Sequence, residues 1–205
     1  MGVGILVVQH GEKVRSAGDP GLTDEGHRQA AVVAMWLAEN RPEVKAIVAS
    51  PLRRAQETAD PIAAAFGLDL MTDARLRERM NWDDGSSIGI DEFMTEWQRA
   101  TDDRSYQPAA GDSSVDAADR FIAALVDLER GDAGVVVVVT HGGVTVDALR
   151  TIVGDDAVVE ANAHLISDGV PSCAITQLLI RRGAVSVIHF PSTEHLGQTT
   201  RHRPV

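Results

Sequence analysis

Cysteine is nearly absent from this sequence of 205 residues. The single cysteine, Cys173, excludes an internal disulfide framework and a zinc site built from cysteines. No apolar run approaches the roughly 20 residues that a membrane-spanning helix needs. The first residues lack the basic segment of a signal peptide. These absences predict no membrane association and a location in the reducing cytoplasm.

Positive charge is also scarce. Lysine and arginine number 19 against 30 aspartates and glutamates, which gives a formal net charge of −11. Nucleic acids and anionic membranes need a basic surface, so neither is expected as a partner. A small anionic substrate needs only a local basic pocket and stays compatible with this balance. Apolar residues make up 44% of the chain, enough to bury the core of one domain spanning residues 1–205.

Short apolar segments rich in β-branched residues alternate with helical periodicities. The segments predict strands at residues 4–9, 44–49, 68–71 and 135–139, and an edge hairpin of residues 173–180 and 184–190. Helices are expected after an N-cap at Thr23 and over residues 52–66, 113–128 and 144–153, with a kink or restart at Pro61 and a C-cap at Gly67. This alternation predicts an α/β fold, with a mostly parallel sheet in a three-layer α/β/α arrangement.

Residues 73–111 break this alternation. They are rich in charge, glycine and serine, with a short helical pattern around Phe93, Met94 and Trp97. We interpret the segment as a small lid insertion over one end of the sheet. Its aromatic and apolar residues either pack the lid onto the domain or provide apolar area for an organic leaving group.

Polar residues follow the predicted strands where ligands bind in such sheets. His10 and Gly11 follow the first strand, and His141 and Gly142 follow the apolar strand 135–139. An arginine pair and a glutamate follow two further strands, Arg53, Arg54 and Glu78. Because glycine allows a close approach of the backbone to a ligand, the pattern predicts an anion site that contains imidazole groups.

Four motifs resemble, in the same order, those of the histidine phosphatase superfamily, also called the phosphoglycerate mutase-like family. They are Val8-Gln9-His10-Gly11-Glu12, Leu22-Thr23-Asp24-Glu25-Gly26, Ser50-Pro51-Leu52-Arg53-Arg54-Ala55 and Val139-Thr140-His141-Gly142-Gly143. The similarity extends from about residue 5 to residue 190. It implies the phosphoglycerate mutase-like form of the three-layer fold.

The resemblance also implies roles for individual residues. His10 is the nucleophile that carries the phosphoryl group, Arg54 and His141 hold the phosphoryl oxygens, and Glu78 is the general acid. Further substrate contacts are expected from Gln9, Gly11, Ser16, Thr23 and Gly142. The remaining histidines are interpreted as surface or edge residues: His27, His164, His189, His195 and His202.

Three assignments keep alternatives. Glu78 lies among arginines and could form a surface ion pair, in which case Asp83 or Asp84 is the rival acid. Arg54 is preferred to Arg53 because it matches the family position. Thr23 could serve only as a helix cap.

The residue before the nucleophile departs from the family. Relatives commonly have an arginine where this chain has Gln9, so a charged, bidentate phosphate contact becomes a neutral amide contact. Lys13 or Arg15, in the loop that follows, could restore the missing charge or could face solvent. The change leaves the fold prediction intact and bears on catalytic power and substrate.

These inferences predict a phosphomonoester hydrolase of the histidine acid phosphatase type, with no metal and no cofactor, acting on a small phosphorylated metabolite through a phosphohistidine. One alternative is a catalytically weakened phosphate-binding or regulatory protein on the same fold. Another is a phosphoglycerate mutase-type phosphotransferase, which the acidic lid disfavours. A metal-dependent hydrolase with His10, His141 and Glu78 as ligands ranks last, because Arg54 would repel the cation. The edge strand around residues 184–190 permits a homodimer.

Overall fold

A computed structural model describes residues 2–82, 88–131 and 134–198. Its sheet has six strands in the order β3-β2-β4-β1-β5-β6. The bounds are β1 Val3–Gln9, β2 Val44–Ala49, β3 Leu70–Thr72, β4 Val135–Thr140, β5 Ile175–Arg181 and β6 Ala184–Ser192. Strands β1, β2, β3 and β4 run parallel to one another. At one edge of the sheet, β5 pairs antiparallel with β1, and β6 pairs antiparallel with β5. The predicted, mostly parallel sheet with an edge hairpin is confirmed.

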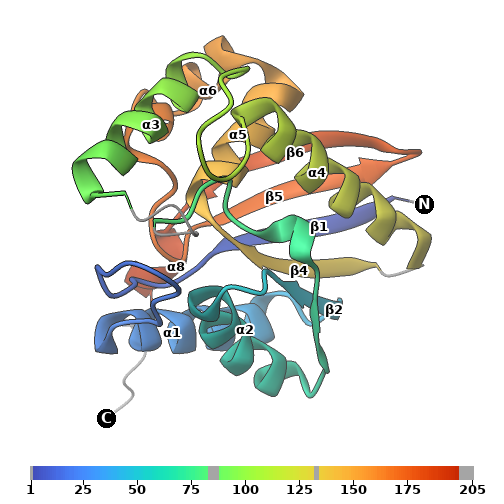
Figure 1. Ribbon diagram of the computed structural model, residues 1–205. Coiled ribbons are helices and arrows are strands. Elements are labelled where there is room, and N and C mark those ends of the chain that lie inside the picture. The colour runs from blue at the N-terminus through green and yellow to red at the C-terminus, as the bar shows by residue number, and fades with distance from the viewer. Residues whose placement is uncertain (1, 83–87, 132–133, 199–205) are drawn as a thin grey trace.

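Helices cover both faces of this sheet (Figure 1), which confirms the three-layer arrangement. The longer ones are α1 Asp24–Asn40, α2 Arg53–Phe66, α3 Ile90–Asp102, α4 Ser114–Asp127 and α5 Gly142–Val153. The shorter ones are α6 Asp155–Ala161, α7 Leu165–Asp168, α8 Glu194–Gln198 and the 3-10 helices Ala74–Leu76 and Leu128–Gly131. Successive side chains of a strand point to opposite faces. Accordingly Ile5 and Val7 pack with Phe121 of α4, whereas Leu6 and Val8 pack with Val33 of α1.

Local signals set several helix ends. The Thr23 side chain accepts a hydrogen bond from the Gly26 N–H at 3.0 Å and caps α1, as predicted. Helix α2 runs through Pro61 as one helix and ends at Gly67, whose φ of 63° is the left-handed conformation that glycine adopts readily. Pro61 therefore does not restart the helix. The prediction missed α6, α7 and α8.

Residues 73–111 hold a 3-10 turn and α3, which is longer than the short pattern in the sequence indicated. The guanidinium of Arg150 in α5 donates to the backbone oxygen of Thr101, which fixes the end of α3 against α5. Asp83 and Asp84, the rival acids, lie outside the described residues. None of the helices in the described ranges is both long and apolar enough to cross a membrane.

Candidate active site

Strand register places the two motif histidines side by side. Gln9 at the end of β1 pairs with Thr140 at the end of β4, so His10 and His141 each follow by one residue. Their ring centroids lie 5.3 Å apart. Ser50, the first residue after β2, donates its N–H to Val139 in β4 at 2.9 Å and reaches the same end of the sheet.

The His10 ring is held in one tautomer. Its Nδ1 lies 2.7 Å from the backbone oxygen of Gly11, which can only accept, so Nδ1 carries the proton. The other nitrogen, Nε2, then keeps a free lone pair. His10 is 8% exposed, and burial, followed by the charge of Arg54, lowers its pKa to about 3. The ring is therefore neutral at physiological pH, the form that can act as a nucleophile.

Arg54 supplies a cation beside this ring. It is buried in the first turn of α2, and its guanidinium lies 3.8 Å from the carboxylate of Asp19. The same carboxylate accepts from the Arg53 N–H and so satisfies a donor at the helix start. The Arg53 side chain instead points to solvent and pairs with Glu57 at 2.6 Å. The structure thus separates the two arginines as the sequence interpretation preferred.

His141 is completely buried at the start of α5. Its Nε2 lies 2.7 Å from the Ser50 hydroxyl, while Nδ1 has no hydrogen-bond partner among the described residues. Burial, with a smaller contribution from Arg54, lowers the pKa of His141 well below its ordinary value. Ser50 was not among the predicted site residues, although it opens the third motif.

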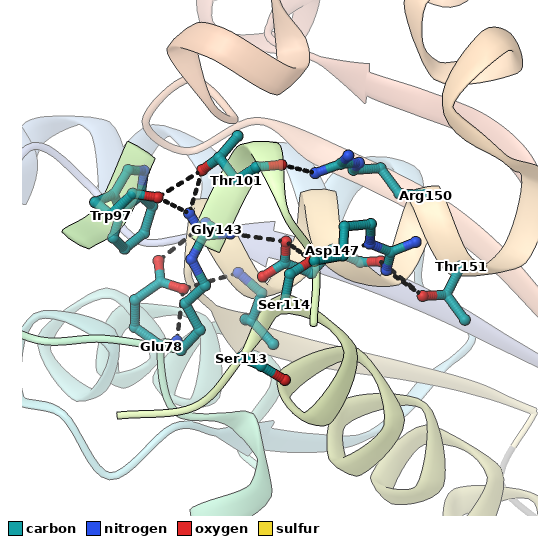
Figure 2. A network of polar contacts seen from close by, with 12 residues as sticks. Glu78, Trp97, Thr101, Ser113, Ser114, Gly143, Asp147, Arg150 and Thr151 are labelled. Carbon is teal, nitrogen blue, oxygen red and sulfur yellow. Dashed lines mark hydrogen bonds and ion pairs between the residues drawn. The ribbon is translucent and has the colours of Figure 1, made fainter. Parts of the chain in front are cut away.

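Glu78 lies at the N-terminus of α5, where backbone N–H groups lack helical partners. Its Oε2 accepts from the Gly143 N–H at 2.9 Å and its Oε1 from the Val144 N–H at 2.8 Å. Figure 2 shows Glu78 beside Gly143. A Cβ at Gly143 would lie 2.6 Å from Glu78 Oε1 and 2.5 Å from the Trp97 ring. Only glycine at position 143 therefore lets both side chains approach.

A buried ion pair between Arg79 and Asp147 lies next to Glu78. Arg79 donates to Asp147 in α5 at 2.9 Å and to Thr101 in α3, and Ser114 in α4 donates to Asp147 at 2.7 Å. Figure 2 shows this network joining three helices next to Glu78. Burial raises the pKa of Asp147 to about 6, against the opposing effect of Arg79. No local sequence pattern indicates this pair, because its members lie 68 positions apart along the chain.

A cavity of about 280 Å³ opens at this end of the sheet. Its polar lining includes four predicted site residues, His10, Ser16, Arg54 and Glu78, and also Lys13, which the sequence offered as a source of positive charge. Burial first, then Arg54 and Arg15, lowers the pKa of Lys13. Arg15 is exposed and does not line the cavity. Of the two basic residues considered in this loop, Lys13 is the one placed to supply charge.

Five predicted site residues do not line the cavity: Gln9, Gly11, Thr23, His141 and Gly142. The Gly11 N–H donates to the Thr58 hydroxyl at 3.0 Å. The hydroxyl of Thr23 is engaged with Glu12 and with the start of α1. Gln9 is buried, with an Oε1 that has no hydrogen-bond partner among the described residues.

Within the described ranges, no three histidine, cysteine, aspartate or glutamate side chains are grouped so as to hold a metal ion. A second cavity, of about 380 Å³, lies against Trp36 and the edge strands and contains none of the predicted site residues. His195 lines this cavity beside the edge strands but is buried. The prediction that it is a surface residue is therefore wrong. The cavity of about 280 Å³ is the one that His10, Arg54 and Glu78 line together.

Similarity to known proteins extends over most of this chain. A sequence model described as histidine phosphatase superfamily, branch 1, matches residues 5–190. A glucosyl-3-phosphoglycerate phosphatase of Mycolicibacterium vanbaalenii is 32% identical over 168 residues, which cover 73% of this chain and 74% of the relative. An uncharacterized protein of Mycobacterium tuberculosis is 37% identical over 150 residues, covering 67% and 72%.

Solved structures give the same fold. The native structure of a mycobacterial glucosyl-3-phosphoglycerate phosphatase superposes with a TM-score of 0.73 at 22% identity, covering 94% of this chain and 100% of the other. A phosphoserine phosphatase from Entamoeba histolytica gives 0.69 at 22% identity, covering 95% and 99%. The predicted fold class is confirmed, as is the prediction of a phosphatase of this superfamily. The chain belongs to branch 1 of the histidine phosphatase superfamily.

Proposed function

We propose that this protein hydrolyses phosphomonoesters of small metabolites through a phosphohistidine on His10, without a metal ion. One observation carries the proposal: a buried, neutral imidazole whose Nδ1–H donates to Gly11 and whose Nε2 is left with its lone pair beside Arg54. A fixed tautomer next to a cation is the arrangement that in-line attack on a phosphate ester requires.

In the first step, the lone pair of His10 Nε2 attacks phosphorus, and the bond from phosphorus to the ester oxygen breaks. Arg54 and Lys13 offset the charge on the phosphoryl oxygens as they move toward the transition state. His141 accepts from the Ser50 hydroxyl at Nε2 and donates a further hydrogen bond to them from Nδ1, the nitrogen without a partner among the described residues. Glu78 protonates the leaving oxygen, so that the product leaves as an alcohol.

In the second step, water attacks the phosphohistidine. Glu78, now ionised, takes a proton from that water, the N–P bond breaks, and inorganic phosphate is released with the imidazole regenerated. Each Glu78 oxygen can accept two hydrogen bonds, and Oε2 uses one on Gly143. Its second lone pair is therefore available to carry the transferred proton.

The remaining predicted contacts complete the proposal. Ser16 lines the cavity and binds the substrate directly. Gln9 and Gly142 shape the wall behind the phosphoryl group, since the Gln9 Nε2 lies 3.5 Å from where a Cβ on Gly142 would stand. Gly11 and Thr23 contribute by positioning the loop after β1. Residues 73–111 act as the lid of a single catalytic domain.

The relatives support the substrate class. Glucosyl-3-phosphoglycerate and phosphoserine, named for two of them, are both small phosphorylated metabolites. We propose a cytoplasmic location for such chemistry. We also propose a homodimer through β6, which is an edge strand and exposes Ile188. Light scattering on the purified protein tests the dimer.

The test is a panel of phosphate esters assayed for phosphate release by the wild type, by His10→Ala and by a control, His164→Ala, at an exposed histidine. The mechanism is supported if His10→Ala abolishes hydrolysis while His164→Ala retains it, and if the circular dichroism of both variants matches that of the wild type. Trapping of acid-labile, base-stable phosphate on the wild type identifies the phosphohistidine.

Two results would overturn the proposal. Full activity of His10→Ala contradicts the nucleophile, and activity that is lost in EDTA and restored by zinc or magnesium contradicts the metal-free reaction. Binding of inorganic phosphate without turnover of any ester would favour a phosphate-binding protein, the alternative that the neutral Gln9 motivates.

A further inference from the structure

The lid helix α3 directs an apolar stripe at the catalytic cavity. Ile90, Phe93, Met94 and Trp97 follow one another at positions i, i+3, i+4 and i+7 of α3, which places them on one helix face. All four line the cavity that contains His10. Ile90 is 45% exposed and Met94 52% exposed, so this face is not used up in packing the lid onto the domain.

The cavity has two chemically different ends. Its basic residues, Lys13 and Arg54, belong to the phosphoryl end with His10. The lid end is lined by the stripe together with Met80, Asn81 and Trp82. Among the described lining residues, no cation accompanies the stripe, and the charged group beside it is the carboxylate of Glu78, next to Trp97. A leaving group bound there meets apolar side chains, one neutral amide and the proposed general acid.

The cation behind Trp97, Arg79, is unavailable to a ligand. The guanidinium of Arg79 stacks on the Trp97 ring at 4.0 Å and is paired with the buried Asp147. The stacking fixes the position of the Trp97 ring in the cavity wall. The positive charge of Arg79 is neutralised by Asp147 and not by a ligand. A carboxylate or second phosphate on the leaving group would therefore lose its hydration without gaining a cation.

From this polarity we infer that the lid end is a subsite for apolar, uncharged leaving groups, so that the preferred substrates are monophosphate esters of hydrophobic alcohols. The inference rests on the proposed function for hydrolysis, but it concerns binding as well. It contrasts with the charged, polar esters named for the relatives, whose leaving groups need polar contacts.

The expected effect follows from burial of methylene groups. Each buried CH₂ contributes up to about 0.8 kcal/mol, which corresponds to a factor of about four. From ethyl to hexyl phosphate, kcat/KM should therefore rise about two- to fourfold per carbon. The acidity of the leaving alcohol stays nearly constant along this series, so the trend reports binding. Glycerol 3-phosphate and 3-phosphoglycerate should fall below butyl phosphate.

The experiment has a binding arm and a catalytic arm. Calorimetric titration with ethyl- to hexylphosphonate, which cannot be hydrolysed, measures the subsite without turnover, and the ester series measures it in catalysis. Met94→Ala should weaken the hexyl ligand by about threefold or more and leave the ethyl ligand unchanged. Met35→Ala, a control at a methionine of 53% exposure on α1, should change neither.

The two ideas fail differently. Phosphonate affinity that is flat or falls with chain length, or equal effects of Met94→Ala and Met35→Ala, overturns the subsite. Affinity that rises with chain length while no ester is hydrolysed supports the subsite and refutes the proposed hydrolase. A higher kcat/KM for 3-phosphoglycerate than for hexyl phosphate would also overturn the subsite.

Discussion

Replacing His10 by asparagine should make the folded protein more resistant to acid. In the folded state burial and Arg54 hold the pKa of His10 at about 3, whereas the unfolded chain has the ordinary value of 6.5. Below pH 6.5 the unfolded state therefore binds a proton that the folded state cannot. Stability that is fully present above pH 6.5 is lost as the pH falls toward 3. Asparagine retains a donor near the Nδ1 position and removes the titration.

The magnitude follows from these two values. At pH 8 His10 is neutral in both the folded and the unfolded state, so its contribution to the pH dependence of the free energy of unfolding is close to zero. At pH 5 the ratio of the two binding polynomials is about 30, which costs the wild type about 2 kcal/mol. His141 is buried in both proteins, so its own acid sensitivity cancels in the comparison.

Urea unfolding at pH 8 and at pH 5 measures the effect. The free energy of unfolding of the wild type, minus that of His10→Asn, should fall by about 2 kcal/mol between the two values. His164→Asn, at an exposed histidine, should show no such change relative to the wild type. A difference that stays within about 0.5 kcal/mol across this range would refute a neutral, desolvated His10, since the linkage requires the larger shift.

Three further predictions concern the residues around His10. Glu78→Gln should lower turnover of alkyl phosphates by about a hundredfold or more, and turnover of p-nitrophenyl phosphate much less, since a good leaving group needs no proton; equal losses would leave Glu78 only a helix cap. Asp147→Ala should lower the free energy of unfolding by about 3–5 kcal/mol in urea, because the Arg79 charge stays buried without its partner; a loss below about 1 kcal/mol would contradict this. Gln9→Arg should leave the Kd of inorganic phosphate nearly unchanged by calorimetry, because Lys13 lines the cavity and already supplies the charge; a Kd lower by about ten- to a hundredfold would mean that the wild-type site lacks that charge.

The sequence determined the layered fold because its signals are local. Apolar strands ending in His10 and His141, the cap at Thr23 and the stop at Gly67 are each set by a few neighbouring residues. Strand ends of a parallel sheet meet at one edge, so the convergence of the histidines with Arg54 followed as well. The family motifs then identified the chemistry. The boundaries of α3 escaped prediction, because its apolar stripe faces a cavity rather than the core.

Only the tertiary structure decided how the site is held and what surrounds it. Ser50 contacts His141, which lies 91 positions further along the chain, and Arg79 pairs with Asp147, which lies 68 positions further. Local sequence patterns do not extend over such separations. The choice of Lys13 over Arg15 depended on which side chain the loop turns into the cavity. The low pKa of His10 arises from burial by several elements at once and from a cation on another helix. Such properties depend on distances in space, which the order of residues along the chain does not contain.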